Sequence, residues 1–251
     1  DVAQDVVALD DGGFLLAGHT TSIGAGGTDA YVVRTDENGE RLWAKTYGGE
    51  YNEYVFAARA LADGGFVLAG TVYSDETTNF AALLIRLDAD GDEVWTQTFD
   101  GAYDDVALGV QVLDDGGFVL AGWTTSYGAN GTDGYLVRVD EDGNEVWHAR
   151  CGGAYDDAFS AVQVLADGRF AAAGWYAWES DDASDNAYAV VTSNAGVEEW
   201  HRTYGGVEND NAQDLDILPD GGLILAGWTD SFTSSRAAYV VRTNASGIAV
   251  N

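Results

Sequence analysis

An acidic residue recurs at near-constant intervals along this 251-residue chain. Every copy after the first follows a glycine by a few residues. Carboxylate oxygens gathered in a ring are the ligands that hard cations such as Ca²⁺ prefer. A carboxylate beside a glycine turn also accepts backbone N–H bonds and then only caps that turn. We favour capping and keep a cation site as the alternative for the set Asp1, Glu53, Asp105, Asp157 and Asp210.

Two further carboxylates, Asp5 and Asp214, share one repeat position inside the strand that follows these acidic residues. Two carboxylates that face each other across a channel are the groups that hydrolyse glycosides. The sequence shows no matching funnel of aromatic and basic residues around them. We therefore expect Asp5 and Asp214 to lie close together at a solvated channel end, and we keep hydrolysis as the alternative.

Aromatic residues follow several copies of a recurring Ala-Gly step. Their rings could stack on the C–H faces of sugars while nearby Asp and Asn side chains bind the hydroxyl groups. The same rings could instead fill gaps between packed sheets, because tryptophan is usually largely buried. We favour packing and keep ligand contact as the alternative. The candidate ligand-binding residues are Trp123, Trp175, Trp228, Tyr127 and His19.

The acidic turns at 88–93 and 140–145 resemble calcium-binding loops in composition but not in spacing. An EF-type loop needs glycine at its sixth position and a bidentate glutamate at its twelfth. Counted from Asp88, those positions hold Glu93 and Phe99, so we predict hairpin turns. The histidines and Cys151 show no zinc-ligand spacing, and no cofactor is predicted apart from the Ca²⁺ alternative.

Charge is the strongest feature of the composition. Asp and Glu number 42 against 11 Lys and Arg, which gives a formal net charge of −31. We exclude nucleic acid as a partner, because binding phosphate needs basic surfaces, and we expect no membrane insertion. A single lysine with abundant aspartate resembles proteins of extremely halophilic archaea, since molar salt screens such charges within about 3 Å.

A repeated unit must position these side chains. The phrase DDGGFLLAG, which ends at Gly18, returns in altered form ending at Gly70, Gly122, Gly174 and Gly227. The intervals are 52, 52, 52 and 53 residues, a period typical of solenoids and propellers. The unit is rich in Gly, Thr, Val, Tyr and Trp and has frequent turn signals, which favours strands over helices.

Four strands are predicted in the third unit, at 106–113, 118–124, 134–140 and 145–150. The first two are apolar on both faces, which indicates sheets packed between neighbouring sheets. We predict an all-β fold, a five-bladed β-propeller with four antiparallel strands per blade, in a single domain. The blades are expected at about 1–52, 53–104, 105–156, 157–209 and 210–251.

Two stretches carry a family resemblance. Residues 121–147, AGWTTSYGANGTDGYLVRVDEDGNEVW, resemble the kelch pattern of a glycine step, an aromatic on the third strand and a tryptophan on the fourth. Residues 87–99, LDADGDEVWTQTF, are similar to quinoprotein-type repeats. Strict kelch repeats carry a double glycine where this chain has Ala-Gly. The resemblance implies a propeller that serves as a binding platform, without specifying a ligand.

The two ends of the chain predict an uneven seam. The fifth unit ends before its outer strand, so the last blade should lack most of that strand. We expect blade 5 to pack face to face on blade 1 and to expose the strand at 237–243 as an edge. Such an edge invites pairing with another chain. Flanking sequence of a larger protein is the alternative source of the missing strand.

The favoured function is a non-enzymatic binding or scaffold propeller, salt-adapted and extracellular or on the cell surface, with a glycan or a protein as partner. The alternative is a carbohydrate-active hydrolase that uses the channel carboxylates. A quinone-dependent dehydrogenase ranks third, because the acidic faces lack the Arg and Lys that would anchor a tricarboxylate cofactor.

Overall fold

The computed structural model describes residues 1–74, 78–128, 131–177 and 184–250. These residues form 19 strands in five antiparallel sheets, of which four have four strands and the last has three. They contain no helix, and therefore none that could cross a membrane. The all-β prediction is confirmed.

Each sheet is one blade, and its strands follow the order of the chain. Blade 1 consists of β1 (Val2–Ala8), β2 (Phe14–Thr20), β3 (Asp29–Thr35) and β4 (Arg41–Tyr47). Blade 2 consists of β5 (Asn52–Ala60), β6 (Phe66–Ser74), β7 (Asn79–Leu87) and β8 (Glu93–Phe99). Blade 3 consists of β9 (Asp105–Val112), β10 (Phe118–Thr124), β11 (Asp133–Val139) and β12 (Glu145–Cys151). Blade 4 consists of β13 (Asp157–Val164), β14 (Phe170–Ala177), β15 (Asp185–Thr192) and β16 (Glu198–Tyr204). Blade 5 consists of β17 (Asp210–Ile217), β18 (Leu223–Thr229) and β19 (Ala237–Arg242).

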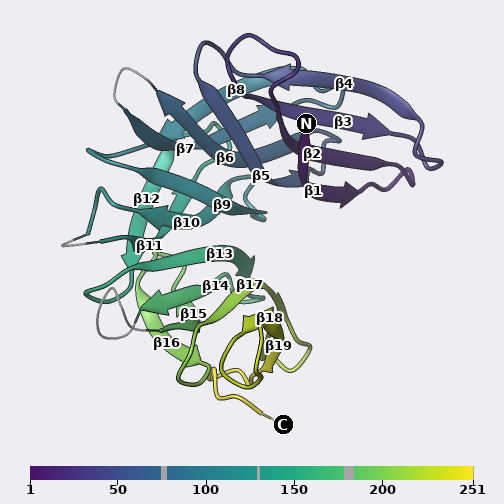
Figure 1. Cartoon of the computed structure of the whole chain (residues 1–251). Helices are drawn as coiled ribbons and strands as arrows, with labels where there is room; N and C mark the ends of the chain where they lie inside the picture. The colour runs from purple at the N-terminus through teal and green to yellow at the C-terminus, as the bar shows by residue number, and fades with distance from the viewer. Residues whose placement is uncertain (75–77, 129–130, 178–183, 251) are drawn as a thin grey trace.

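The blades follow one another along an arc, with the first strand of each on the inner side (Figure 1). The inner strands β1, β5, β9, β13 and β17 each contact the next one in this series. The four strands of blade 3 begin and end within one residue of the predicted ranges. Most of the candidate site residues lie near the ends of these strands, next to the connectors and loops.

The glycine of the Ala-Gly step is required by a close approach between two strands. β9 and β10 pair with a bulge between Ala121 and Gly122. A Cβ on Gly122 would collide there with the carbonyl oxygen of Val106. The glycines equivalent to it in the other blades meet the same obstacle: Gly18, Gly70, Gly174 and Gly227. The recurring phrase in the sequence thus reflects one backbone contact that is made in every blade.

Apolar cores fill the junctions between successive blades. Between blades 2 and 3, for example, Val67 and Leu84 of one blade pack with Leu120 and Val137 of the next. Blades 2, 3 and 4 are accordingly apolar on both faces, as predicted from the strand patterns. Burial of these faces against neighbours is what holds the arc together.

Blade 5 does not pack on blade 1. Figure 1 shows β1 and β17–β19 at separate ends of the arc, with a gap between them. The exposed fractions are 61% for Val6 on blade 1 and 62% for Val240 on blade 5. Residues equivalent to Val6 are at most 2% exposed: Ala58, Val110, Val162 and Leu215. The predicted closure is wrong, because the side chains in each core set the angle between blades and four such steps leave the circle open.

Within the described residues, blade 5 has no outer strand, as predicted, and β19 is the edge of its sheet. Beyond β19, the chain makes a single bridge between Thr243 and Ala249. The expected exposed edge is therefore confirmed.

An arginine on the third strand fastens the first turn in most blades. The Arg138 guanidinium, with 11% of its side chain exposed, binds the carboxylate of Asp115 at 2.5 Å and also the carbonyl oxygen of Val139. The same ion pair joins Arg34 to Asp11, Arg86 to Asp63 and Arg242 to Asp220. These pairs tie each hairpin to the strand beside it.

Candidate functional site

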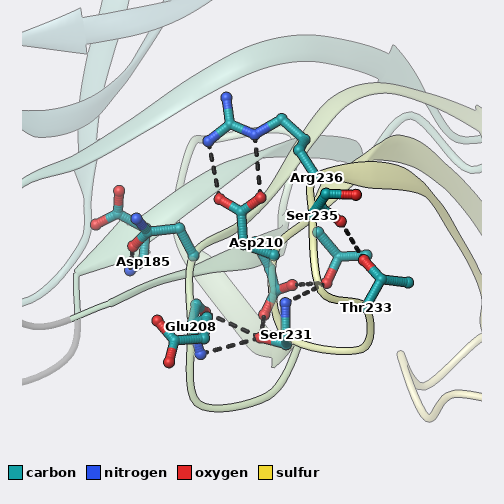
Figure 2. A network of polar contacts seen from close by, with 10 residues as sticks. Asp185, Glu208, Asp210, Ser231, Thr233, Ser235 and Arg236 are labelled. Carbon is teal, nitrogen blue, oxygen red and sulfur yellow. Dashed lines mark hydrogen bonds and ion pairs between the residues drawn. The ribbon is translucent and has the colours of Figure 1, made fainter.

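Four of the five repeated carboxylates are buried where a connector enters the innermost strand. Figure 2 shows Asp210, whose Oδ2 accepts hydrogen bonds from Ser231 Oγ at 2.7 Å and from Gly206 N at 2.8 Å. The amides of Gly101 and Gly153 donate in the same way to Asp105 and Asp157, at 2.7 and 2.6 Å. These carboxylates thus bind the backbone of their own connectors.

Two of the buried carboxyl groups lie beside a second acid. Burial and the nearby charge of Asp29 raise the pKa of Glu53 to about 7. Burial and the charge of Asp133 raise the pKa of Asp157 to about 7. One oxygen of Glu53 and one of Asp157 have no hydrogen-bond partner among the described residues. Both groups therefore change protonation near neutral pH, far above the ordinary range of carboxyl groups.

The repeated carboxylates are distributed over separate blade junctions. Within the described ranges, no three His, Cys, Asp or Glu side chains gather as a metal ion would require. A cation site built from Asp1, Glu53, Asp105, Asp157 and Asp210 stays a prediction. The acidic turns are hairpins, in which Asp88 and Asp140 each accept a 2.8 Å hydrogen bond from an amide four residues on.

Asp5 and Asp214 do not form a pair. Asp5 accepts hydrogen bonds from Ala58 N at 2.9 Å and Arg59 Nη1 at 3.2 Å, both on blade 2. Asp214 lies on β17, at the other end of the arc (Figure 1). The expected approach of the two carboxylates is wrong, because it depended on contact between blades 1 and 5.

An aromatic pocket of about 290 Å³ opens at the junction of blades 2 and 3. Its lining residues are Tyr54, Phe56, Thr71, Phe80, Val106, Leu108 and Trp123. The inner strands β5 and β9 supply four of them, and β10 supplies Trp123 just after its Ala-Gly step. Tyr54, Phe56, Phe80 and Trp123 are all partly exposed, so a ligand can reach four aromatic side chains at one place.

This pocket arises where one junction departs from the repeat. The position of Phe56 on β5 holds Leu108 in blade 3 but Gln4, Ser160 and Gln213 in the other blades. Blades 2 and 3 are the only neighbours that both carry a large apolar residue at this position, and blade 3 also carries a tryptophan after its Ala-Gly step. Trp123 was predicted from the sequence as a ligand-binding residue, whereas Tyr54, Phe56 and Phe80 were not. The available signal was a phenylalanine at a position that is polar in most repeats.

A second groove of about 560 Å³, with both polar and apolar lining residues, adjoins the aromatic pocket and shares Phe80 with it. The groove is lined by Tyr51, Val72, Asn79, Phe80, Ala81, Thr98, Asp100, Gly101, Ala102 and Tyr103. Tyr103, on the connector to blade 3, is 61% exposed. Hydroxyl, amide and carboxylate groups therefore lie next to a pocket made of rings.

The other predicted tryptophans do not line this pocket. Trp228 on blade 5 lies under the guanidinium of Arg236, 3.5 Å from the ring centroid. Arg236 in turn pairs with Asp230 at 2.9 Å. Trp175 is half-buried at the same repeat position in blade 4. The predicted aromatic residues thus belong to separate junctions.

His19 and Tyr127 also lie outside the pocket lining. The His19 ring packs edge-on against Tyr54, with centroids 5.1 Å apart, and burial lowers its pKa. The Tyr127 ring stacks on His148 at 4.3 Å. A ligand role for these two residues stays a prediction.

Two segments of the chain, residues 114–144 and 218–247, match a family described as a domain of unknown function (DUF5122) beta-propeller. Each segment contains the second and third strands of one blade. The regulatory protein FlaEY of Caulobacter vibrioides is 25% identical over 198 residues. The matched region is 65% of this chain and only 21% of that protein.

Solved structures of other proteins are similar to this chain in fold. The WD40 domain of Neurospora crassa Pan2 superposes with a TM-score of 0.63 at 13% identity, over 99% of this chain and 64% of that one. The fold is that of a β-propeller. Puromycin hydrolase matches with a TM-score of 0.53 at 17% identity, over 98% of this propeller and 38% of the hydrolase. Likeness at such low identity establishes the fold alone.

Proposed function

We propose that this propeller is a non-enzymatic binding module whose ligand is a glycan, held between blades 2 and 3. The observation that carries the proposal is the convergence of Tyr54, Phe56, Phe80 and Trp123 on one accessible pocket. Sugar rings present C–H faces that pack on aromatic side chains, as other apolar groups do. A few polar groups beside such a pocket then orient the ligand.

The chemistry of the two hollows favours an uncharged sugar. Among the described residues, no ionisable group other than Tyr54 lines the aromatic pocket, and Asp100 is the only carboxylate that lines the second groove. The net charge of −31 also repels acidic polysaccharides. Neutral glycans therefore fit this site better than uronic acid polymers or sulfated chains.

The proposal extends to the working environment, which we take to be high salt at or outside the cell surface. Nine of the 11 Lys and Arg side chains form ion pairs with carboxylates. Most of the acidic groups in the described ranges have no cationic partner, so dissolved cations must compensate them. Glycans on cell surfaces are ligands that such a module would meet there.

A glycan array in molar KCl tests this function, followed by titration of the best ligand with tryptophan fluorescence as the readout. Trp123→Ala should weaken binding at least about tenfold, because it removes a wall of the pocket. The matched control is Trp175→Ala, which removes the tryptophan from the same repeat position in blade 4. Silence of the wild-type chain across all neutral glycans would refute the glycan proposal. Equal losses in both variants would refute the location of the site.

Hydrolysis is the alternative for the same class of ligand. The carboxylate pair on which it depended, Asp5 and Asp214, is divided between the ends of the arc. We therefore favour binding without turnover. Release of reducing sugar from a bound glycan would contradict this part of the proposal.

A further inference from the structure

Blade 1 exposes to solvent a face that every other blade buries against its predecessor. Phe14 and Val6 on this face are 37% and 61% exposed. Residues at the position of Phe14 in the later blades are at most 3% exposed: Phe66, Phe118, Phe170 and Leu223. The sequence of blade 1 keeps the apolar pattern of a face that packs on another sheet.

A tryptophan on the outer strand of one blade covers a glycine turn of the next. The Trp43 ring lies against Gly91, where a Cβ would come within 2.7 Å of it. The same arrangement joins Trp95 to Gly143, Trp147 to Gly196 and Trp200 to Gly247. All four glycines are buried. Their equivalent in blade 1, Gly39, is exposed and has open space where its Cβ would be.

The same outer strand makes a second contact, four residues after the tryptophan. The hydroxyl group of Tyr47 donates a 2.7 Å hydrogen bond to the carbonyl oxygen of Gly91. Tyr204 donates in the same way to Gly247, also at 2.7 Å. In these two outer strands, the tryptophan and the tyrosine together contact the glycine turn of the next blade.

We propose that the open face of blade 1 binds an additional, complete four-stranded blade of this same repeat, which continues the arc. Its outer strand must carry a tryptophan that lies on Gly39 and Phe14. The position four residues later holds Tyr47, Phe99, Cys151 and Tyr204 in the outer strands of blades 1 to 4, so a tyrosine there is favoured but not required. Among the described residues, blade 5 ends at β19 and presents no outer-strand tryptophan. We therefore commit to an added blade, and a second copy of the chain is an outcome that the test distinguishes. This inference is independent of the proposed glycan site, which uses other residues.

The test measures whether a cysteine on the open face becomes protected. Val6→Cys is labelled with a maleimide in molar KCl, in the chain as it is and in a chain with residues 157–209 repeated ahead of Asp1. Cys151 gives little background, because it is buried and burial raises the pKa of its thiol to about 12. The added blade should slow labelling more than about tenfold. The matched control replaces Trp200 and Tyr204 by serine in the added copy alone, and should recover most of the labelling.

Each other outcome overturns the proposal. If circular dichroism shows that the added blade is folded and the Val6→Cys variant is still labelled at the same rate, the proposal is wrong. Residues 53–104 serve as a second version of the added blade. Protection in the unextended chain that increases with concentration would show that a second copy covers the face. Protection at every concentration would show that blade 5 closes the ring.

Discussion

The carboxyl groups of Asp29 and Glu53 meet at the junction of blades 1 and 2, where both lie against Gly48. A Cβ on Gly48 would lie 3.3 Å from Asp29 Oδ1 and would collide with Glu53 Oε2. Asp29 accepts a 3.0 Å hydrogen bond from Ala25 N, which stabilises its charge, whereas Glu53 Oε2 has no partner among the described residues. Burial and the neighbouring charge of Asp29 therefore raise the pKa of Glu53.

Stability should consequently fall as the pH rises through the neutral range. The pKa values of Glu53 and Asp157 are raised to about 7, so the folded chain binds more protons than the unfolded chain between the ordinary carboxyl range and pH 7. The contribution of these two groups to the free energy of unfolding is fully present below their pKa in the unfolded chain. It is lost as the pH rises through their pKa in the folded chain. Urea unfolding in molar KCl should show a higher midpoint at about pH 5 than at about pH 8.

The Glu53→Gln variant should reduce this pH dependence, because it removes one of the two titrating groups. Asp36→Asn is the control: backbone hydrogen bonds from Glu40 and its neighbours lower the pKa of Asp36, so its titration lies below the tested window. A wild-type midpoint that is flat or rises toward alkaline pH would contradict the assignment.

Removal of salt should unfold the chain. The net charge of −31 arises from 42 Asp and Glu against 11 Lys and Arg. Lowering the salt from molar to millimolar lengthens the range of repulsion between these charges from about 3 Å to well over 10 Å. Tryptophan fluorescence during dialysis should report a cooperative transition that reverses when KCl is restored. A spectrum that does not depend on salt would refute salt adaptation.

Gly122→Ala should destabilise the fold by about 1–3 kcal/mol, because the added methyl group must displace the bulged strand. The matched control is Gly49→Ala, where the Cβ position has nothing within 4 Å. That change should stay within about 0.5 kcal/mol of the wild type. Denaturant unfolding in molar KCl measures both, and equal effects would show that the close approach does not require glycine.

Arg138→Ala should cost about 1–3 kcal/mol, because it removes charge-assisted hydrogen bonds of a side chain that is only 11% exposed. Arg242→Ala breaks the equivalent pair in blade 5, where the arginine side chain is 51% exposed. Its cost should be below about 1 kcal/mol and should shrink further in molar salt. If the two losses are equal in chemical denaturation, burial of the arginine is not what gives the pair its strength.

The blades could be predicted from the sequence because local chemistry specifies them. Strand boundaries follow from turns such as Asp114 to Gly117 and from runs of apolar residues, and a repeat shows each boundary several times. Closure of the ring could not be predicted, because the angle between blades depends on side chains such as Leu84 and Val137 that meet only in the fold.

The pocket was harder to predict than the fold for a related reason. Phe56 and Trp123 lie 67 positions apart in the numbering and on different blades, so their meeting depends on how two blades are placed. Alignment of the repeats also draws attention to what the blades share. The pocket lies where one repeat differs, as Phe56 differs from Gln4 and Ser160.

An open arc in which each blade contacts only its neighbours has two terminal blades from which unfolding can begin, whereas a closed ring has none. Disorder that begins at a terminal blade uncovers one further interface and can then travel inward, as in other linear arrays of repeats. Amide protons in blade 3, two junctions from either end, should outlast those in blades 1 and 5. The lifetime of the folded molecule is then governed by how firmly its outermost units are held.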